Sequence, residues 1–190
     1  MIIGLTGKAR AGKDTAAQII RRLLPKTKVV LLSFSEPLYD MVRASEIFDS
    51  VDELTGDMKS EPTGDFHVSL RYVLQTLGTE WGRKLIHPDL WCNLGLRQCV
   101  DPETVYVLTD VRFLNEEQAI RNRGGLIWKI DDLRYEHKTR WDRVAEFFGV
   151  THWQRHQSET EMEQIEVDAV IVNRKLGSDI YASNIRNVLK

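Results

Sequence analysis

One segment near the N-terminus restricts the fold of this chain more than any other: a loop bounded by glycines between a strand pattern and a helix pattern. The apolar run Ile2–Thr6 precedes the loop Gly7–Thr15, and Ala16–Ile20 continues as a helix. Glycines at such positions let backbone N–H groups turn inward around an anion, and the helix N-terminus adds partial positive charge. Lys13 adds a mobile cation that can reach the outer phosphates of a nucleotide. The order of strand, loop and helix therefore predicts a site for a nucleoside triphosphate.

The residue after the lysine departs from the usual pattern of phosphate-binding loops. A serine or threonine normally follows and holds Mg²⁺ through its hydroxyl, whereas here Asp14 follows and Thr15 comes next. A carboxylate suits a hard cation, so we favour a metal or phosphate-site role for Asp14 and Thr15. The alternative is that Asp14 is a negative charge in the first turn of the helix. The residues expected to hold the phosphates are Gly7, Lys8, Ala9, Arg10, Ala11, Gly12, Lys13, Asp14 and Thr15.

The composition is that of one ordinary globular domain, and it argues against several classes of protein. The 190 residues carry a formal net charge of −2 with both signs interspersed, so no basic stripe predicts nucleic-acid binding. No apolar stretch is long enough to cross a membrane and no signal peptide precedes the first strand, so we expect a cytoplasmic protein without membrane contact. Cys92 and Cys99 fit no zinc or redox spacing, and the histidines form no metal motif.

Strand patterns and helix patterns alternate along the chain, which predicts an α/β fold with a mostly parallel sheet. The strand patterns are short and rich in Val, Ile and Leu, as in a sheet that is covered on both faces. The predicted strands are Ile2–Thr6, Lys28–Phe34, Val105–Thr109, Leu126–Ile130 and Ala169–Val172. The predicted helices are Lys13–Leu24, Val68–Lys84, Asp89–Cys99, Asn115–Arg123, Arg140–Phe148 and Ser178–Leu189.

Two stretches fit this sheet poorly. Ala44–Asp65 is strongly acidic, and we interpret it as a solvated loop with a short helix or two. Asp131–Arg155 is dense in Arg, Lys, His and Trp, and two interpretations of it are nearly balanced: a closing lid, or a pair of amphipathic surface helices. We favour the lid, because an enzyme with such a loop must exclude water from the terminal phosphate.

A carboxylate follows the buried strand pattern that ends at Thr109. Asp110 comes next, and Arg112 lies two residues further on. In proteins with this kind of phosphate-binding loop, an acid at the C-terminal tip of the neighbouring strand usually orders Mg²⁺ or its waters. The alternative is that Asp110 caps the helix that follows. We favour a metal-site role, so the candidate metal residues are Asp14, Thr15 and Asp110.

The predicted helix Val68–Lys84 carries a polar strip at steps of four residues. Two arginines and an amide in one strip could bind a second phosphate and contact a base edge, although a solvent-facing stripe is the simpler alternative. Trp81 and Trp91 could fill the core or stack on a base, and the core is the safer expectation for a single tryptophan. The strip comprises Arg71, Gln75, Thr79 and Arg83.

Several motifs together resemble one known family. Besides the loop, they are Phe34–Leu38, the block Leu70–Arg83 with the sequence LRYVLQTLGTEWGR, Asp110–Glu116 with the sequence DVRFLNE, and His156–Glu159. The chain is similar in these segments to the phage-type deoxynucleoside monophosphate kinases, a branch of the P-loop nucleoside monophosphate kinase superfamily. The blocks around Arg71–Arg83 and Asp110–Glu116 are the discriminating ones, because the loop is generic.

The resemblance implies a three-layer P-loop kinase fold with a five-stranded, mostly parallel sheet in a single domain, 1–190. Within it we expect a helical monophosphate-binding arm at about 35–100 and an arginine-bearing lid at about 131–158. The implied reaction is phosphoryl transfer from ATP, with Mg²⁺, to a deoxynucleoside monophosphate, and a homodimer is expected on the same likeness. The substrate-binding residues would be Ser35, Leu38, Arg71, Gln75, Thr79, Arg83, Trp91 and Asp110. The catalytic residues would be Lys13, Arg71, Arg112 and the lid arginine Arg140.

An acceptor phosphate is already an oxyanion at neutral pH, so direct in-line transfer would need no general base. Two other functions remain open at this point. A kinase for another small acceptor such as dephospho-coenzyme A would need a base for a hydroxyl, and Asp14 is the obvious candidate. A non-catalytic ATP-binding module would bind ATP without any dependence on a monophosphate.

Overall fold

The structure is a computed structural model of the 190-residue chain, and it describes residues 1–132, 161–173 and 178–189. The chain divides into two compact units, which are considered separately below. The first unit comprises residues 1–31 and 101–190, and the second comprises residues 32–100. The predicted helix Arg140–Phe148 lies outside the described residues.

The first unit is built on a sheet with the strand order β2-β5-β1-β6-β7. The pairs β1–β5, β1–β6 and β6–β7 are parallel, so the carboxyl ends of these strands lie at one edge. This confirms the predicted α/β fold and its five strands, although β2 is shorter than expected. The strands are β1 (Ile2–Thr6), β2 (Val29–Leu32, which ends at the boundary of the unit), β5 (Val105–Leu108), β6 (Leu126–Asp131) and β7 (Ala169–Val172).

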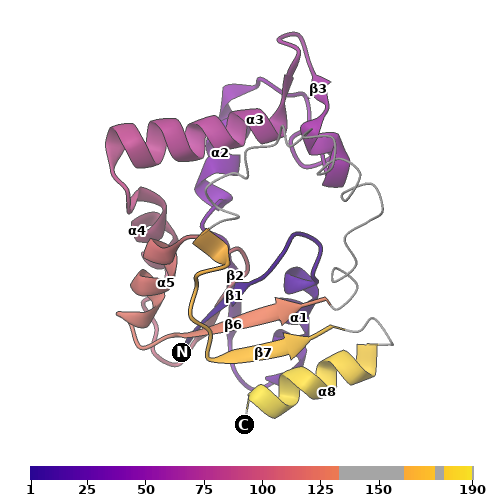
Figure 1. Cartoon of the computed structure of the whole chain (residues 1–190), viewed down its shortest axis with the longest axis vertical. Helices are drawn as coiled ribbons and strands as arrows, with labels where there is room; N and C mark the ends of the chain where they lie inside the picture. The colour runs from indigo at the N-terminus through magenta and orange to yellow at the C-terminus, as the bar shows by residue number, and fades with distance from the viewer. Residues whose placement is uncertain (133–160, 174–177, 190) are drawn as a thin grey trace, which may run out of the picture. The chain divides into compact units, whose positions relative to one another are not determined.

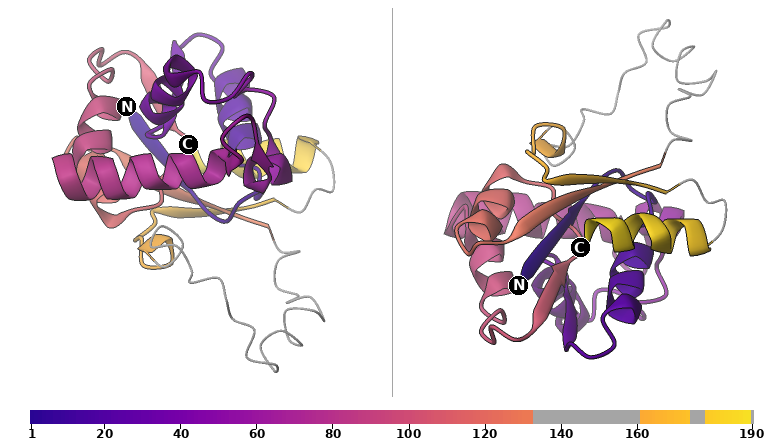
Figure 2. Two further views of the ribbon diagram at one scale, coloured as in Figure 1. Left: turned by 90° about the horizontal axis from the view of Figure 1, so that it is seen from above. Right: turned by 90° about the horizontal axis from the view of Figure 1, so that it is seen from below.

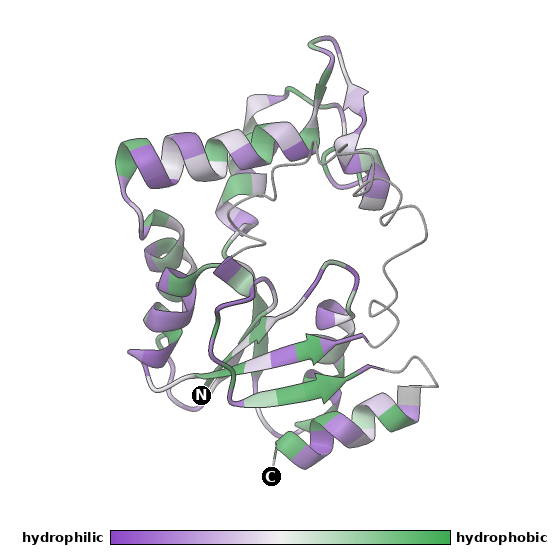
Figure 3. Ribbon diagram, in the orientation of Figure 1, coloured by the Kyte–Doolittle hydropathy of each residue, from purple (hydrophilic) through white to green (hydrophobic). Residues whose placement is uncertain are grey.

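Helices pack on both faces of this sheet, which is why its strands read as continuous apolar runs. Helices α1 (Lys13–Leu23) and α8 (Ser178–Val188) contact each other (Figures 1 and 2). Their side chains Ile20 and Ile185 are fully buried in the core with residues of the sheet. Helix α5 (Leu114–Arg121) contacts β1 and β6. Figure 3 shows apolar colour along β7, whereas β6 and α8 carry both apolar and polar bands.

The second unit is mostly helical and has its own small core. A hairpin of two short antiparallel strands, β3 and β4, precedes its longest helix. That helix begins as an α-helix and continues with π-type hydrogen bonding. The elements are α2 (Glu36–Ser45), the 3-10 helix η1 (Gly56–Ser60), β3 (Pro62–Thr63), β4 (Val68–Ser69), α3 (Leu70–Gln75), the π-helix η2 (Thr76–Ile86) and α4 (Leu90–Leu96).

The second unit differs from the prediction in two places. The predicted helix Val68–Lys84 starts later, because Val68 and Ser69 pair with β3 and the Ser69 hydroxyl caps the helix by accepting from the Tyr72 N–H. Helix α2 was not predicted at all. Its sequence has Pro37 as an early residue, which suits the first turn of a helix, where the missing N–H is not needed.

The acidic stretch Ala44–Asp65 is solvated as predicted, but it is also anchored. All of its Asp and Glu residues are exposed, and it contains the short helix η1. Phe48 and Val51 are nevertheless buried with Val42 and Leu70 in the core of the second unit. The stretch is therefore held in place by apolar side chains. Among the described residues, no helix is long and apolar enough to span a membrane.

Candidate functional site

The loop between β1 and α1 has the backbone conformation that its glycines predict. Gly7 and Gly12 have φ angles of 132° and 102°, and Arg10 lies in the left-handed region at 63°. A Cβ on Gly7 would collide with the carbonyl oxygen of Ile130, so this position requires glycine on two grounds. The loop ends at Gly12, whose carbonyl accepts the N–H of Ala16 at 2.9 Å as α1 begins.

Lys13 folds back over the loop. Its Nζ donates to the carbonyl oxygens of Gly7 at 2.6 Å and Lys8 at 3.0 Å. Burial, reinforced by the positive charge of Arg112, lowers the pKa of Lys13 from 10.5 to about 8, although Asp14 and Asp110 oppose the shift. The ammonium is thus poorly compensated by the protein around it, which is the state expected of a cation that serves a polyanionic ligand.

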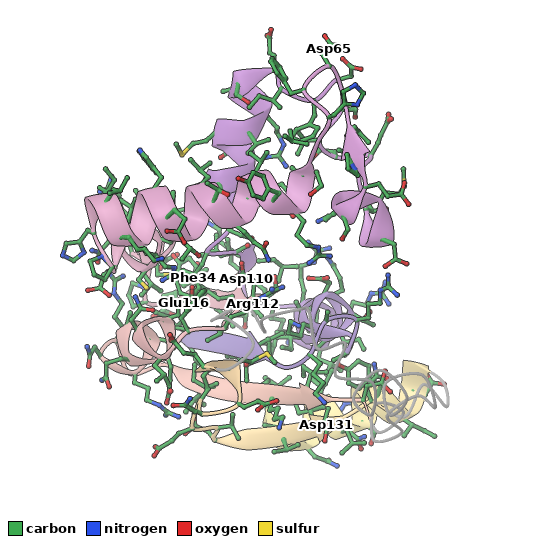
Figure 4. All side chains as sticks on the ribbon, turned by 45° about the horizontal axis from the view of Figure 1, so that its top comes forward. Phe34, Asp65, Asp110, Arg112, Glu116 and Asp131 are labelled. Atoms are coloured by element: carbon green, nitrogen blue, oxygen red, sulfur yellow. The ribbon has the colours of Figure 1, made fainter. Side chains whose placement is uncertain are left out.

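The turn after β5 brings together the carboxylate of Asp110, the positively charged Arg112 and the buried carboxylate of Glu116. Asp110, Arg112 and Glu116 cluster in Figure 4, and both Asp110 and Arg112 are close enough to affect the charge of Lys13. The Glu116 carboxylate is 2 % exposed and accepts the backbone N–H groups of Arg112 at 2.8 Å and Phe113 at 3.1 Å. Since Phe113 is the N-cap of α5, Asp110 does not cap the helix, and its location favours the metal-site interpretation over the capping one.

The donors at this edge fit a magnesium ion that is held mainly by phosphates and water. Among the described residues there is no group of three or more His, Cys, Asp or Glu side chains that could hold a metal by itself. Mg²⁺ typically uses one or two carboxylates together with substrate phosphates, a role that Asp14, Thr15 and Asp110 could serve. At the end of β1, the hydroxyl of Thr6 is 1 % exposed and has no hydrogen-bond partner in the described structure. A polar ligand at this edge would satisfy it.

Two residues that sequence reasoning missed support the loop from behind. The Asn173 side-chain amide donates to the Ala11 carbonyl at 2.9 Å, and the Tyr181 hydroxyl donates to the Gly12 carbonyl at 3.1 Å. Burial, with the nearby charge of Asp132, raises the pKa of Tyr181. The available signal was the position of Asn173, a polar residue directly after the predicted strand Ala169–Val172.

The predicted polar strip of the second unit lies along α3 and η2. An α-helix takes 3.6 residues per turn, so a step of four residues rotates the side chain slightly more than one full turn around the helix axis. A π-helix bonds residue i to i+5 and takes more residues per turn, so the same spacing falls short of one turn. These two angular offsets have opposite signs. The change of helix type at Thr76 therefore keeps the strip closer to one face of the helix than a continuous α-helix would. The strip residues are Arg71, Gln75, Thr79 and Arg83.

The members of this strip differ in exposure. Arg71 is exposed, and its Nε donates to the Ser60 hydroxyl at 2.8 Å. Thr79 is 8 % exposed, and Gln75 lies between these extremes. Arg83 makes a long hydrogen bond of 3.4 Å to the Pro88 carbonyl. The guanidinium of Arg71 is therefore the most accessible cation of the strip.

The remaining predicted substrate residues of this unit lie at α2 and α4. Ser35 is the N-cap residue of α2, and its hydroxyl lies 2.7 Å from that of Ser33. Leu38 is buried and packs close to Gly78. Trp91 is 1 % exposed, and its indole N–H donates to the Gly78 carbonyl at 2.8 Å. Trp91 thus fills the core of the unit, which is the role that the sequence also allowed.

The predicted lid at about 131–158 falls almost wholly on residues 133–160, outside the described part of the chain, and so does its catalytic candidate Arg140. The roles of these residues stay predictions.

Comparison with known proteins supports the resemblance that the motifs suggested. The chain is 29 % identical over 202 aligned positions to a protein of Acanthamoeba polyphaga mimivirus provisionally named a deoxynucleotide monophosphate kinase, with 97 % of this chain and 94 % of that protein covered. It is 25 % identical to the deoxynucleoside-5′-monophosphate kinase of Escherichia phage T5, over 66 % of this chain and 74 % of that enzyme. No family model matches the chain.

This chain is a relative of the deoxynucleoside monophosphate kinases. The shikimate kinase of Bacteroides thetaiotaomicron has a similar fold, with a TM-score of 0.51 and 17 % identity, over 100 % of this chain and 98 % of that one. That likeness concerns the fold alone. The chain therefore shares its fold with a solved kinase and its sequence likeness with two proteins named as deoxynucleotide or deoxynucleoside monophosphate kinases.

Proposed function

We propose that this chain transfers the γ-phosphoryl group of ATP to a deoxynucleoside 5′-monophosphate, giving ADP and the diphosphate. The observation that carries the proposal is Lys13, held in a phosphate-binding loop and flanked by Asp110 and Arg112 from the end of the neighbouring strand. The named function of the mimivirus and phage T5 relatives supplies the acceptor class.

The main task of such a site is to neutralise two polyanions that must come within bonding distance. Burial lowers the pKa of Lys13, so its positive charge costs free energy in the ligand-free site, and a bound triphosphate would compensate that charge. Arg112 would share the charge that develops on the transferred group. Asp14, Thr15 and Asp110 would hold Mg²⁺ directly or through waters, and that ion would neutralise phosphate charge when bound.

The acceptor would be held by the second unit. We assign its phosphate to Arg71 and Arg83, because a guanidinium fork matches phosphate oxygens and because both lie on the polar strip of α3 and η2. Gln75 and Thr79 would contact the base or sugar from the same strip. Since the acceptor is already an oxyanion, the residues need only orient it for in-line attack.

The test is a coupled assay of ADP formation with ATP and Mg²⁺ over a panel of acceptors. The panel contains the deoxynucleoside and ribonucleoside monophosphates, dephospho-coenzyme A and a reaction without acceptor. We expect ADP formation that depends on at least one deoxynucleoside monophosphate, with a new diphosphate detected by ³¹P NMR. Turnover with dephospho-coenzyme A alone, or ATP binding without any acceptor-dependent turnover, would contradict the proposal.

A further inference from the structure

Two carbonyl oxygens of the phosphate-binding loop accept hydrogen bonds from residues far away in the sequence. Asn173, at the end of β7, donates to Ala11, which lies 162 residues earlier. Tyr181, on α8, donates to Gly12 across 169 residues. Asn173 and Tyr181 are only 5 % and 4 % exposed, so both side chains are largely shielded from bulk water.

These two bonds act on the face of the loop that binds anions, although they touch its other side. In a trans peptide the C=O and the following N–H point in opposite directions within one plane. Holding the Ala11 carbonyl therefore sets the direction of the Gly12 N–H, and holding the Gly12 carbonyl sets that of the Lys13 N–H. Such inward N–H groups are the donors that a phosphate-binding loop uses.

We propose that Asn173 and Tyr181 are positioning residues that pre-organise the loop for the triphosphate. The proposal rests on ATP being the donor in the proposed function, and it does not depend on the acceptor. Both residues act through the Ala11–Gly12–Lys13 backbone, and neither is assigned a contact with the nucleotide.

The support is itself held in place. The Asn173 N–H donates to the Asp131 carbonyl at 2.7 Å, and the side-chain amide of Asn184 on α8 donates to the Val172 carbonyl at 3.0 Å. A Cβ at Gly12 would collide with the Asn173 amide nitrogen, so the loop and its support are in direct contact. A loop that is already held in its binding conformation loses less conformational entropy when the ligand binds.

The experiment measures binding of inorganic tripolyphosphate and of ATP to the whole chain by titration calorimetry. Tripolyphosphate probes the loop without adenine or ribose, so it separates positioning of the loop from a direct contact between Asn173 and adenine. The variants are Asn173→Asp, which puts an acceptor oxygen against the Ala11 carbonyl, and Tyr181→Phe, which removes only the hydroxyl. We expect affinity for both ligands to fall roughly ten- to hundredfold in Asn173→Asp and about three- to tenfold in Tyr181→Phe.

One control matches these changes elsewhere in the same unit. Tyr106→Phe removes a tyrosine hydroxyl that accepts the Asp101 N–H near the amino end of β5, away from the loop. This control should lower the unfolding temperature without a comparable loss of tripolyphosphate affinity.

The outcomes are decisive in either direction. Weaker binding of both ligands, with the KM of the monophosphate unchanged at saturating ATP, supports positioning. Loss of ATP affinity with unchanged tripolyphosphate affinity would make Asn173 an adenine contact and overturn the proposal. Lower stability with unchanged affinities would also overturn it.

If Asn173→Asp does not fold, the result for Tyr181→Phe alone decides the test. A wild-type chain that binds tripolyphosphate but phosphorylates no monophosphate would refute the proposed function and leave this test intact.

Discussion

The phosphate-binding loop of the first unit presents main-chain groups, whereas helix α3–η2 of the second unit presents side chains. The loop has glycine conformations that no other residue adopts easily, and Asn173 and Tyr181 brace it from behind. The strip on α3–η2 depends on helix geometry, and its most accessible member, Arg71, rests against the hydroxyl of Ser60.

The difference has an energetic side as well. Lys13 is partly buried and its pKa is depressed, so its charge costs free energy until an anion arrives. Arg71 is exposed and its charge remains hydrated. The proposed site for the phosphates of ATP is therefore partly buried, whereas the proposed site for the monophosphate is exposed to solvent. Changes in the loop should consequently have larger effects than changes in the strip.

The largest effect is expected for Lys13→Ala. Phosphoryl transfer should fall by roughly 10²–10³-fold or more, because the variant lacks the partly buried cation that we propose stabilises developing charge. The unfolding temperature should not fall, because the lost charge is one that burial disfavours. Lys26→Ala, an exposed lysine in the same unit, should leave both properties unchanged. Near-normal turnover of Lys13→Ala in the coupled assay would contradict the role proposed for Lys13 and the larger effect expected of changes in the loop.

Gly12→Ala should weaken ATP binding by roughly 10²-fold, because a Cβ there strains a φ of 102° and displaces the Asn173 amide. Gly124→Ala is the matched control. Gly124 also has a positive φ, 69°, but an added Cβ would meet nothing within 4 Å. The control should cost about 1 kcal/mol of stability and no ATP affinity, as measured by denaturant unfolding and calorimetry. Equal ATP affinities in the two variants would show that the loop tolerates displacement of its support.

Arg71→Ala should raise the KM of the monophosphate by roughly ten- to hundredfold, the effect of losing a hydrogen bond between charged groups. The affinity for ATP should change little. The control is Arg43→Ala in the same unit, which removes ion pairs to Glu36, Asp40 and Asp52 and should affect stability instead. A change in ATP affinity as large as that in the monophosphate KM would contradict the separate roles of loop and strip.

The smallest effect concerns pH. Because the pKa of Lys13 is about 8, its charged fraction falls as the pH rises through that value, and tripolyphosphate affinity should fall about tenfold from about pH 7 to about pH 9. Lys13→Arg should show no such slope, whatever its absolute affinity.

The stability of the ligand-free chain should change in the opposite direction. The unfolded state binds more protons than the folded state between about pH 8 and the ordinary lysine value of 10.5, so Lys13 makes folding more favourable as the pH rises through that window. Affinity and stability that fall together with rising pH would show that another group controls both.

The elements read correctly from the sequence are those whose signal is local. The β1–loop–α1 order and β7 were predicted with the correct starts, because apolar runs, glycines and helix periodicity are properties of neighbouring residues. Val68 and Ser69 were assigned to the wrong element because a hairpin partner at Pro62 and Thr63 overrides their helix pattern. Helix α2 was missed although its sequence places apolar residues at Leu38 and Val42, which are buried, and a proline in its first turn.

For the candidate site, the residue types of the loop and of the Asp110–Arg112 turn already indicated phosphate and metal chemistry. The tertiary structure decided what supports and tunes them. Asn173 and Tyr181 meet the loop only because β6, β7 and α8 fold back onto it, and a contact across more than 160 residues leaves no local trace. The pKa of Lys13 likewise depends on burial and on Arg112, which belong to the packed chain rather than to the loop sequence. Chemistry followed from residue identity, while position and charge state followed from packing, because both depend on neighbours that only the fold brings together.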